Sequence, residues 1–504
     1  MSGVGFKMDF PPIGFLGMGG FRYRSKEILM ARFNEEDDEF DSENILERIA
    51  RTTTNQGKAH ELMRAGRDVV HRDASKSMVF YETALDLFVE NGDMTGAAYA
   101  AIAIGFAHCH RRSWSEAAVA YGQAIDFGRA ASRSDLEIDC TFFKGRCHRN
   151  NEDIVEAANL MGQALAIATE VSYPFQTIIR LEYGRLLRKM GRNEDALTVL
   201  EPAIAEARDN DPGNFLPSLT NEKAIALRNL RRYQDGLDLA TESNALSTYF
   251  EAEGEIERSK YLMAELLIEL GREAEALPLL EQVKEFENAL RERKHQLKVD
   301  HLYAKALSGV GRTEEARELL LVLIPLMDSL KLAANAAAAV ADLSITFFAE
   351  GNSLDAQANL EKALIRARAL SDVVLETSIY LSLGIIAYET GDWAQVAEMN
   401  RVVLDSPFAN TQYWFAGAQA DRAVALAKLE QCADAAALAK SAIKLAKPAK
   451  DARTLARANY ALLLAGKAAE VQPKLKPIAT QVVVNALASQ QIDLAQEVSA
   501  EFLG

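Results

Sequence analysis

The sequence repeats itself with a period of about 40 residues. The stretch AELLIELGREAEALPLLEQV begins at Ala264, and a closely similar stretch, AKALSGVGRTEEARELLLVL, begins at Ala304. One column of the repeat holds glycine or a substitute for it, at Gly191, Arg231, Gly271, Gly311, Gly351, Gly391 and Gln431. A fixed period of this length is the signature of a solenoid, in which each repeat packs only against its neighbours.

Each repeat has the pattern of two helices joined by a short turn. Large apolar residues recur at i, i+3, i+4 and i+7 around the glycine column, which indicates one buried stripe per helix. Glycine in the turn tolerates the positive φ at which a helix ends. Asn193, Thr313, Ser353 and Asp392 follow the turns, and we expect them to cap the second helices. No alternating β-branched run predicts a strand.

Small residues occupy two further columns of the repeat. Seven residues before the turn stand Gly184, Ala224, Ala264, Ala304 and Gly384, and five residues after it stand Ala196, Ala276, Ala316 and Ala356. We expect the two helices of a repeat to cross at these positions, because small side chains let their backbones approach closely. The first of these two sets is called the small column below.

These features resemble those of the tetratricopeptide repeat (TPR) family. The family's small pairs appear as Gly184/Ala196, Ala264/Ala276 and Ala304/Ala316, its aromatic residue after the turn as Trp114, Tyr233 and Trp393, and its later alanine as Ala203 and Ala363. The resemblance covers roughly Ala74 to Gly466. It implies an all-α fold, a right-handed superhelical α-solenoid of about ten helical hairpins, each longer than the common unit of about 34 residues.

The domain organisation follows from where the repeat begins and ends. Residues 1–44 form a Gly/Phe-rich arm and an acidic linker, 45–73 N-terminal capping helices, 74–466 the solenoid, and 467–504 C-terminal capping helices. Two interpretations of the arm remain open, an idle flexible tail or a segment that orders on a partner or on another copy. Its anchors in the second case are Phe6, Phe10, Phe15, Leu16, Phe21 and Tyr23.

Composition narrows the classes of partner and compartment. A net charge of −16 over 504 residues argues against nucleic-acid binding, which needs a positive field. Four cysteines are too few for a disulfide scaffold and favour a reducing cytoplasm. We expect no secretory signal, because Asp9, Pro11 and Pro12 interrupt the apolar residues near Met1. No uncharged apolar run of about 18 residues is present, so we expect no membrane span.

The TPR resemblance implies that the first helix of each pair lines a concave groove. The residues one and four positions after the small column are expected to point into it, and their cations are Arg146, Arg149, Arg185, Arg188, Arg228 and Lys305. Such a column predicts binding of carboxylates, since arginine holds them bidentately. The alternative is a set of salt bridges inside the groove with Glu182, Glu222 and Glu265.

Other groove positions refine the expected partner. Asn221 lies one turn before the small column and is expected to hydrogen-bond a peptide backbone. Phe348 and Tyr388, with Ile345 and Ile385, make the later groove positions apolar. The sequence therefore predicts a protein or peptide partner with an acidic segment followed by an apolar one. The carboxylate clamp of chaperone-binding TPR proteins is matched only in part, by Arg185 and Asn221.

Catalytic and metal signatures are weak. The sequence has no P-loop, HExxH, GxSxG or dinucleotide-binding motif, so we expect no enzyme and no cofactor. A zinc site could be drawn from six residues one repeat apart, His108, Cys109, His110, Cys140, Cys147 and His148. Neighbours on a helix point about 100° apart and no CxxC pair is present, which favours packed thiols and hydrogen-bonded histidines over a metal site.

The leading hypothesis is thus a cytoplasmic, non-catalytic scaffold or adaptor for protein–protein interaction. Its concave groove, and the N-terminal arm in the second interpretation, would hold the partner. Two alternatives remain: a peptide-responsive regulatory receptor, and a self-assembling structural protein that docks the arm on the next copy. The last alternative implies a homo-oligomer.

Overall fold

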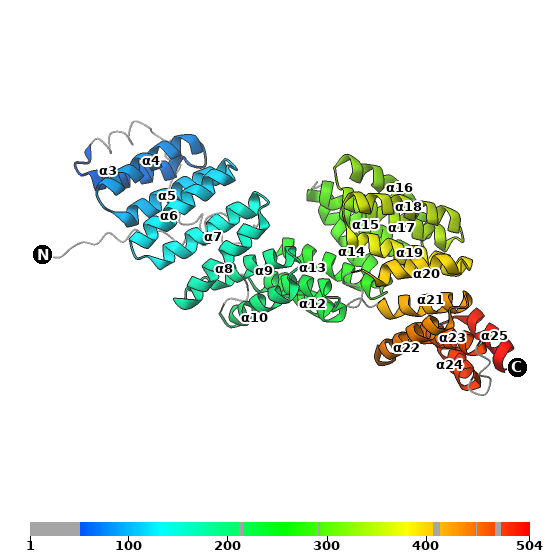
Figure 1. The fold of residues 1–504 in the computed structure, drawn as a ribbon. Coiled ribbons are helices and arrows are strands. Elements are labelled where there is room, and N and C mark those ends of the chain that lie inside the picture. Colours follow the sequence, from blue (N-terminus) through cyan, green and yellow to red (C-terminus); the bar gives the residue numbers. More distant parts are fainter. Residues whose placement is uncertain are drawn as a thin grey trace. The chain divides into compact units, whose positions relative to one another are not determined.

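The structure is a computed structural model that describes residues 51–210, 213, 215–290, 293–406, 414–449, 451–468 and 475–503 (Figure 1). The six residues of the predicted arm, Phe6, Phe10, Phe15, Leu16, Phe21 and Tyr23, lie outside the described residues. Residues 45–50 of the predicted N-terminal cap also lie outside them.

The described part of the chain is helical and contains no strand, as the sequence predicts. Its elements are α3 (Asn55–Val69), α4 (Ala74–Glu90), α5 (Met94–His110), α6 (Trp114–Ala130), α7 (Ser134–Asn150), α8 (Ile154–Glu170), α9 (Gln176–Lys189), α10 (Asn193–Asn210), α11 (Leu216–Asn229), α12 (Tyr233–Tyr249), α13 (Glu253–Glu269), α14 (Glu273–Leu290), α15 (Arg293–Gly309), α16 (Thr313–Ser329), α17 (Ala333–Ala349), α18 (Ser353–Ala369), α19 (Val373–Thr390), α20 (Trp393–Leu404), α21 (Phe415–Lys428), α22 (Cys432–Ala449), α23 (Ala452–Ala468), α24 (Leu475–Ala488), α25 (Ile492–Val498) and the π-helical turn η4 (Ser499–Leu503).

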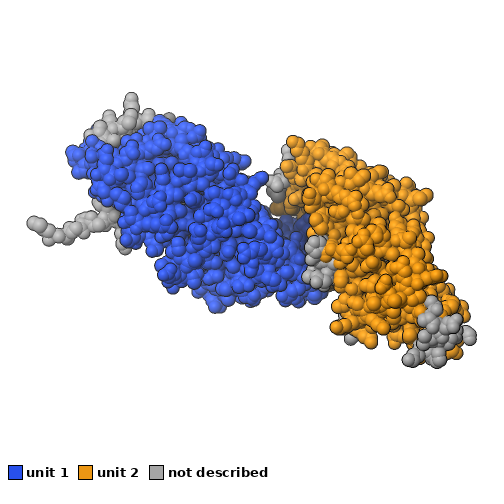
Figure 2. Space-filling view, in the orientation of Figure 1, with its two compact units in different colours: residues 1–266 blue, residues 267–504 orange. Residues whose placement is uncertain are grey.

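The helices form two compact units, residues 1–266 and 267–504, which Figure 2 distinguishes by colour. From α3 to α12 in the first unit, and from α14 to α25 in the second, each helix packs against the next. First helices of neighbouring repeats are also in contact with each other. Examples are α9 with α11 and α15 with α17. Each unit is therefore an α-solenoid of helical hairpins, and the predicted all-α repeat architecture is confirmed.

The residues of the glycine column have the predicted positive φ, with one correction. Gly311 has a φ of 84°, and Arg231 adopts a φ of 63° at the equivalent position although it carries a side chain. In the last repeat of the series the residue with positive φ is Glu430, at 61°, and not Gln431 as the sequence alignment predicts. The turn there comes one residue earlier, so the small column of that repeat falls on Ala423.

The predicted helix caps are correct at one position and wrong at others. Asp392 caps α20, and its side chain accepts a hydrogen bond from the backbone N–H of Gln395. Thr313 and Ser353 lie instead at the first helical position, because α16 and α18 begin one residue earlier than expected, after Arg312 and Asn352. Asn193 is likewise the first helical residue of α10.

Helix crossings occur at the small residues. A Cβ added at Gly184 would lie 2.7 Å from Cδ2 of Leu200, so α9 and α10 approach closely there. Ala196, Ala264 and Ala304 are fully buried. Hydrophobic clusters run along each unit between these crossings rather than gathering in one centre. Burial between neighbours thus stabilises each repeat, as a solenoid requires.

One helix of the described residues, α19, is long and apolar enough by length and composition to cross a membrane. Its sequence nevertheless includes Glu376 and Glu389. In the structure α19 packs against α18 and α20, and Ile379, Leu383 and Ile386 are buried in that contact. Part of the apolar surface of α19 is therefore covered by its two neighbouring helices.

Candidate functional site

The first helices α7, α9 and α11 carry the predicted arginine column of the first unit. Arg146 and Arg149 lie on α7, Arg185 and Arg188 on α9, and Arg228 on α11. All five side chains are partly buried. Arg149, Arg185 and Arg188 form one chain of contacts with glutamates of α9 and α11, and Arg228 forms a separate ion pair. The structure therefore brings the predicted cations together, and pairs them in the way that the salt-bridge alternative describes.

Glu222 on α11 is the centre of this network. Its carboxylate accepts from Nε of Arg185 at 2.9 Å, from Nε of Arg188 at 3.0 Å and from Nη2 of Arg258 at 2.9 Å. Only 2% of the Glu222 side chain is exposed. Burial alone would raise the pKa of Glu222, but the guanidinium groups of Arg185, Arg258 and Arg188 outweigh burial and lower that pKa to about 2.

Two more glutamates extend the network to neighbouring repeats. Glu182 accepts from Nη1 of Arg185 at 2.9 Å and pairs with Arg149 of α7. Glu255 accepts from Nη1 of Arg258 and from the hydroxyl of Ser218, both at 3.0 Å. The connected groups are Arg149, Arg185, Arg188, Arg258, Glu182, Glu222 and Glu255, named the arginine–glutamate network below. Four guanidinium groups face three carboxylates, so the network keeps one positive charge in surplus.

Arg188 is the member of the network with unused donors. Its only hydrogen bond among the described residues is the one from Nε to Glu222, and about one fifth of its side chain is exposed. A guanidinium carries five N–H donors in a planar fork, and the two terminal nitrogens of Arg188 hold four of them. This is the geometry in which arginine grips a carboxylate end-on.

The two remaining arginines of the predicted column, Arg228 and Arg146, have other partners. Arg228 pairs with Glu265 of α13, the third glutamate of the salt-bridge alternative. The guanidinium carbon of Arg146 lies 6.0 and 5.8 Å from the ring centroids of Phe142 and Phe143. Burial lowers the pKa of Arg146, and the charge of Glu182 acts in the opposite direction.

Asn221 lies on α11 beside Glu222 and is only 1% exposed. Neither its amide oxygen nor its amide nitrogen has a hydrogen-bond partner among the described residues. A buried amide without partners costs about 1–3 kcal/mol of stability. Such a group is unusual in a packed helix, and a residue retained at this cost is a candidate for contact with a ligand.

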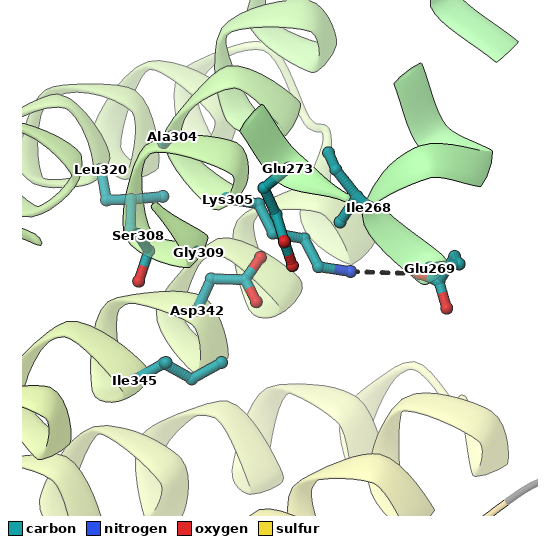
Figure 3. Close-up of a pocket in the computed structure, with 10 residues that line it drawn as sticks. All are labelled: Ile268, Glu269, Glu273, Ala304, Lys305, Ser308, Gly309, Leu320, Asp342 and Ile345. Atoms are coloured by element: carbon teal, nitrogen blue, oxygen red, sulfur yellow. Dashed lines mark hydrogen bonds and ion pairs between the residues drawn. The ribbon is translucent and has the colours of Figure 1, made fainter. Parts of the chain in front are cut away.

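In the second unit, Lys305 lines a cavity of about 300 Å³, and the other lining residues lie on α13 to α17 (Figure 3). Its ammonium group lies 3.2 Å from Glu269, the contact drawn in Figure 3. Glu273 and Asp342 add two more carboxylates to the lining, with Ser308 and Ile345 beside them. Three acids to one lysine make this stretch acidic, in contrast to the basic column predicted to continue here.

Asp342 belongs to a second ion pair of this region. Its carboxylate lies 2.7 Å from Nε2 of His301 on α15. Burial raises the pKa of Asp342, but the bond to His301 and the charges of His301 and Lys305 together lower it below its usual range. The carboxylate is therefore ionised at neutral pH.

The two predicted aromatic residues lie against the protein itself. Phe348 packs on the hydrophobic cluster of α17 to α21. Tyr388 meets Trp393 edge-to-face at 5.3 Å between ring centroids, and the guanidinium carbon of Arg457 lies 4.1 Å from the Tyr388 centroid. Arg457 in turn donates to Asp421 at 2.6 Å. Tyr388 is thus part of a packed cation–π cluster in the structure.

An acidic residue occurs in several repeats two positions before the small column or its equivalent. Two of these acids, Glu182 and Glu222, were predicted from the sequence as salt-bridge partners, whereas Asp342 and, with the corrected turn, Asp421 were not. Each of the four pairs with a basic side chain from a neighbouring repeat or its own. The signal for Asp342 and Asp421 was an acid on an otherwise apolar stretch, where an unpaired charge would be costly.

The six residues considered as zinc ligands, a reading that the sequence disfavours, form no common cluster. Among the described residues, no group of three or more His, Cys, Asp or Glu side chains could hold a metal ion. Cys109 and Cys147 do meet, whereas His148 pairs with Asp153 at 3.2 Å. His108 differs from the expected hydrogen-bonded histidine, because its Nδ1 is buried without a described partner.

Similarity to known proteins is found in the structure and not in the sequence. No protein-family model and no curated protein matches the sequence. The apo form of RapI aligns with 69% of this chain and 96% of its own, with 14% identity and a TM-score of 0.53. The structure of this chain is a tetratricopeptide-repeat (TPR) fold. At this identity the likeness establishes the TPR architecture alone.

Two other solved TPR-type structures are more distant. The apo form of the quorum sensor NprR from B. thuringiensis covers 68% of this chain and 94% of its own, with 14% identity and a TM-score of 0.48. A tetratricopeptide repeat protein from Parabacteroides merdae covers 55% and 97%, with 15% identity and a TM-score of 0.40.

Proposed function

We propose that the chain is a non-catalytic interaction scaffold whose first unit binds an acidic segment of a partner protein on the face shared by α7, α9, α11 and α13, where the sequence predicts a concave groove. The observation that carries the proposal is Arg188, which holds Glu222 through Nε alone and keeps both terminal nitrogens available. A partner carboxylate accepting from these nitrogens would gain two parallel charge-assisted hydrogen bonds.

The arginine–glutamate network favours this role for a physical reason. Its glutamates hold the guanidinium groups in place before a partner arrives, so less side-chain entropy is lost on binding. Its single surplus of positive charge suits a carboxylate. An acidic ligand needs to compete with only one internal carboxylate at Arg188, whereas Arg185 is held by two.

Asn221 provides the second contact of the proposed site. Its amide oxygen and nitrogen would be satisfied by the N–H and C=O groups of a bound main chain. The side chain is buried, so this contact requires the partner to displace the groups that cover it. Binding would then replace the penalty of an unsatisfied amide with two hydrogen bonds.

The second unit is proposed to contact a different part of a partner. The acids Glu269, Glu273 and Asp342 around Lys305 suit a basic or amide-rich group rather than an acidic one. Binding of an apolar partner group to Phe348 and Tyr388 is less well supported, because both rings are packed within the protein. The partner expected from the structure is thus acidic where it meets α9 and α11.

The experiment is affinity capture from the source organism's lysate with four forms of the chain. These are the full chain, the chain without residues 1–44, Arg188→Ala, and the control Arg192→Ala. Arg192 lies in the same repeat, is half-exposed and pairs with Asp195 outside the network. Proteins held by the full chain and by the control but lost from Arg188→Ala would support the groove.

The same experiment separates the alternatives. If removal of residues 1–44 abolishes capture of all partners and Arg188→Ala does not, the arm is the binding site and the groove proposal is refuted. Light scattering of the full chain tests self-assembly, which would appear as a mass that rises with concentration and falls to the monomer when residues 1–44 are removed. A peptide-responsive receptor would instead show a smaller radius of gyration on addition of the peptide.

A further inference from the structure

Two cysteines from successive repeats meet at the C-terminal ends of their helices. Cys109 lies in the last turn of α5 and Cys147 in the last turn of α7, 38 residues further along the chain. Their Sγ atoms are 3.9 Å apart. A disulfide requires about 2 Å, so the two sulfurs need to approach each other by about 2 Å to form one.

The two thiols lie in different surroundings. Cys109 is partly exposed, whereas Cys147 is buried. The sulfur of Cys109 also lies 3.9 Å from the hydroxyl of Tyr121, and the charge of Arg146 is near both thiols. The hydrogen bond between the two thiols lowers the pKa of Cys109 to about 7 against the opposing effect of burial, with Tyr121 and Arg146 lowering it further. The same hydrogen bond raises the pKa of Cys147.

We propose that Cys109 and Cys147 are a redox-active pair that a hydroperoxide converts into a reversible disulfide joining α5 to α7. Cys109 is the attacking thiol because it is accessible and the more acidic of the two. Cys147 is the resolving thiol because its sulfur is already in contact. Disulfides in cytosolic proteins are commonly transient and redox-sensing, which suits a chain with four free cysteines.

The reaction balances in two steps. The Cys109 thiolate attacks one oxygen of hydrogen peroxide, the O–O bond breaks, and the departing hydroxide takes up a proton as water, leaving a sulfenic acid on Cys109. Cys147 then attacks the sulfur of Cys109, the S–O bond breaks, and the hydroxide leaves as a second water with the Cys147 proton. Two thiols are oxidised by two electrons, and the peroxide is reduced to two waters.

Cys147 lies next to the arginine column, so oxidation of the cysteine pair would affect the predicted groove. Cys147 stands between Arg146 and Arg149 on α7, and Arg149 belongs to the arginine–glutamate network. A disulfide would hold α7 to α5 and restrict the movement of α7 against the preceding repeat. The modification is a property of the chain in its own right and does not require the proposed partner.

The test uses the reduced full chain and hydrogen peroxide. After treatment, free thiols are blocked with N-ethylmaleimide, the protein is digested without reductant, and peptides are identified by mass spectrometry. The expected result is a peptide pair joined through Cys109 and Cys147, the loss of two of the four free thiols, and recovery of all four with dithiothreitol. The double variant Cys140→Ser/Cys432→Ser is the control and should lose both of its thiols.

Two further measurements keep the proposal open to refutation if a cysteine variant fails to fold. In the wild-type chain, the rate at which iodoacetamide alkylates Cys109 should rise with pH around a midpoint near 7, because the thiolate is the reactive form. In Cys147→Ser, peroxide should leave a sulfenic acid on Cys109 that dimedone traps. The proposal is wrong if peroxide yields no Cys109–Cys147 peptide in the folded wild-type chain, or if dimedone traps Cys109 there as fully as in the variant.

Discussion

Nε of Arg185 on α9 donates to Oε1 of Glu222 on α11 across 2.9 Å and 37 positions of sequence. The contact joins the first helices of two successive repeats on the face that the arginine column shares. A related contact recurs in the second unit, where Arg457 on α23 donates to Asp421 on α21 across 36 positions. Ion pairs between first helices are therefore part of how the repeats are held in register.

Replacing Glu222 by Gln is expected to lower the free energy of unfolding by about 3 kcal/mol. The change keeps the shape of the side chain but leaves Arg185, Arg188 and Arg258 without their shared carboxylate. Urea denaturation measures the effect. The matched control is Glu201→Gln, which removes an exposed partner of Lys223 and should change stability by no more than about 0.5 kcal/mol. Equal effects of the two changes would contradict the network's structural role.

Acid should remove the contribution of Glu222 to stability. The pKa of Glu222 in the folded chain is lowered to about 2, below the value of about 4.3 expected when unfolded, so the unfolded state binds the proton first. The contribution is complete above about pH 4.5 and is lost as pH falls toward 2. The difference in unfolding free energy between wild type and Glu222→Gln should shrink over this range, and a constant difference would show that Glu222 does not titrate as described.

A methyl group at the α9–α10 crossing should destabilise the first unit. The added Cβ in Gly184→Ala would meet the buried Leu200 at 2.7 Å, and overpacking of this kind costs about 1–3 kcal/mol. The control is Gly254→Ala in α13, where the new Cβ meets no described atom within 4 Å and improved helix propensity should stabilise by less than about 1 kcal/mol. The prediction fails if thermal unfolding shows Gly184→Ala to be as stable as wild type.

The repeat period was enough to predict the helical hairpins, their crossings and the helices on which the arginines lie. Those features depend on side-chain size and on the 3.6-residue periodicity, which are local and visible in the sequence. The caps were harder, because a shift of one residue moved the cap from Thr313 to Arg312. Arg312 instead pairs with Glu315 at 2.6 Å across the first turn of α16.

Pairing across repeats was predictable only in outline. The arginines and the glutamates were both named, but the sequence left open whether Glu222 or an outside carboxylate satisfies Arg185. That choice depends on rotamers and on the offset between first helices, which no spacing rule specifies. The contact between Cys109 and Cys147 was not predicted for a similar reason. The sequence alone does not show which two of the six candidate zinc residues meet.

The groove proposal is tested most directly by the affinity of a synthetic peptide that carries the acidic segment of a captured partner. Isothermal titration calorimetry would compare its binding to wild type, Arg188→Ala and Arg192→Ala. Loss of charge-assisted hydrogen bonds should weaken binding to Arg188→Ala by about tenfold or more, while Arg192→Ala binds like wild type. Equal affinities for all three forms would contradict the assignment of Arg188, and with it the proposed site on α9 and α11.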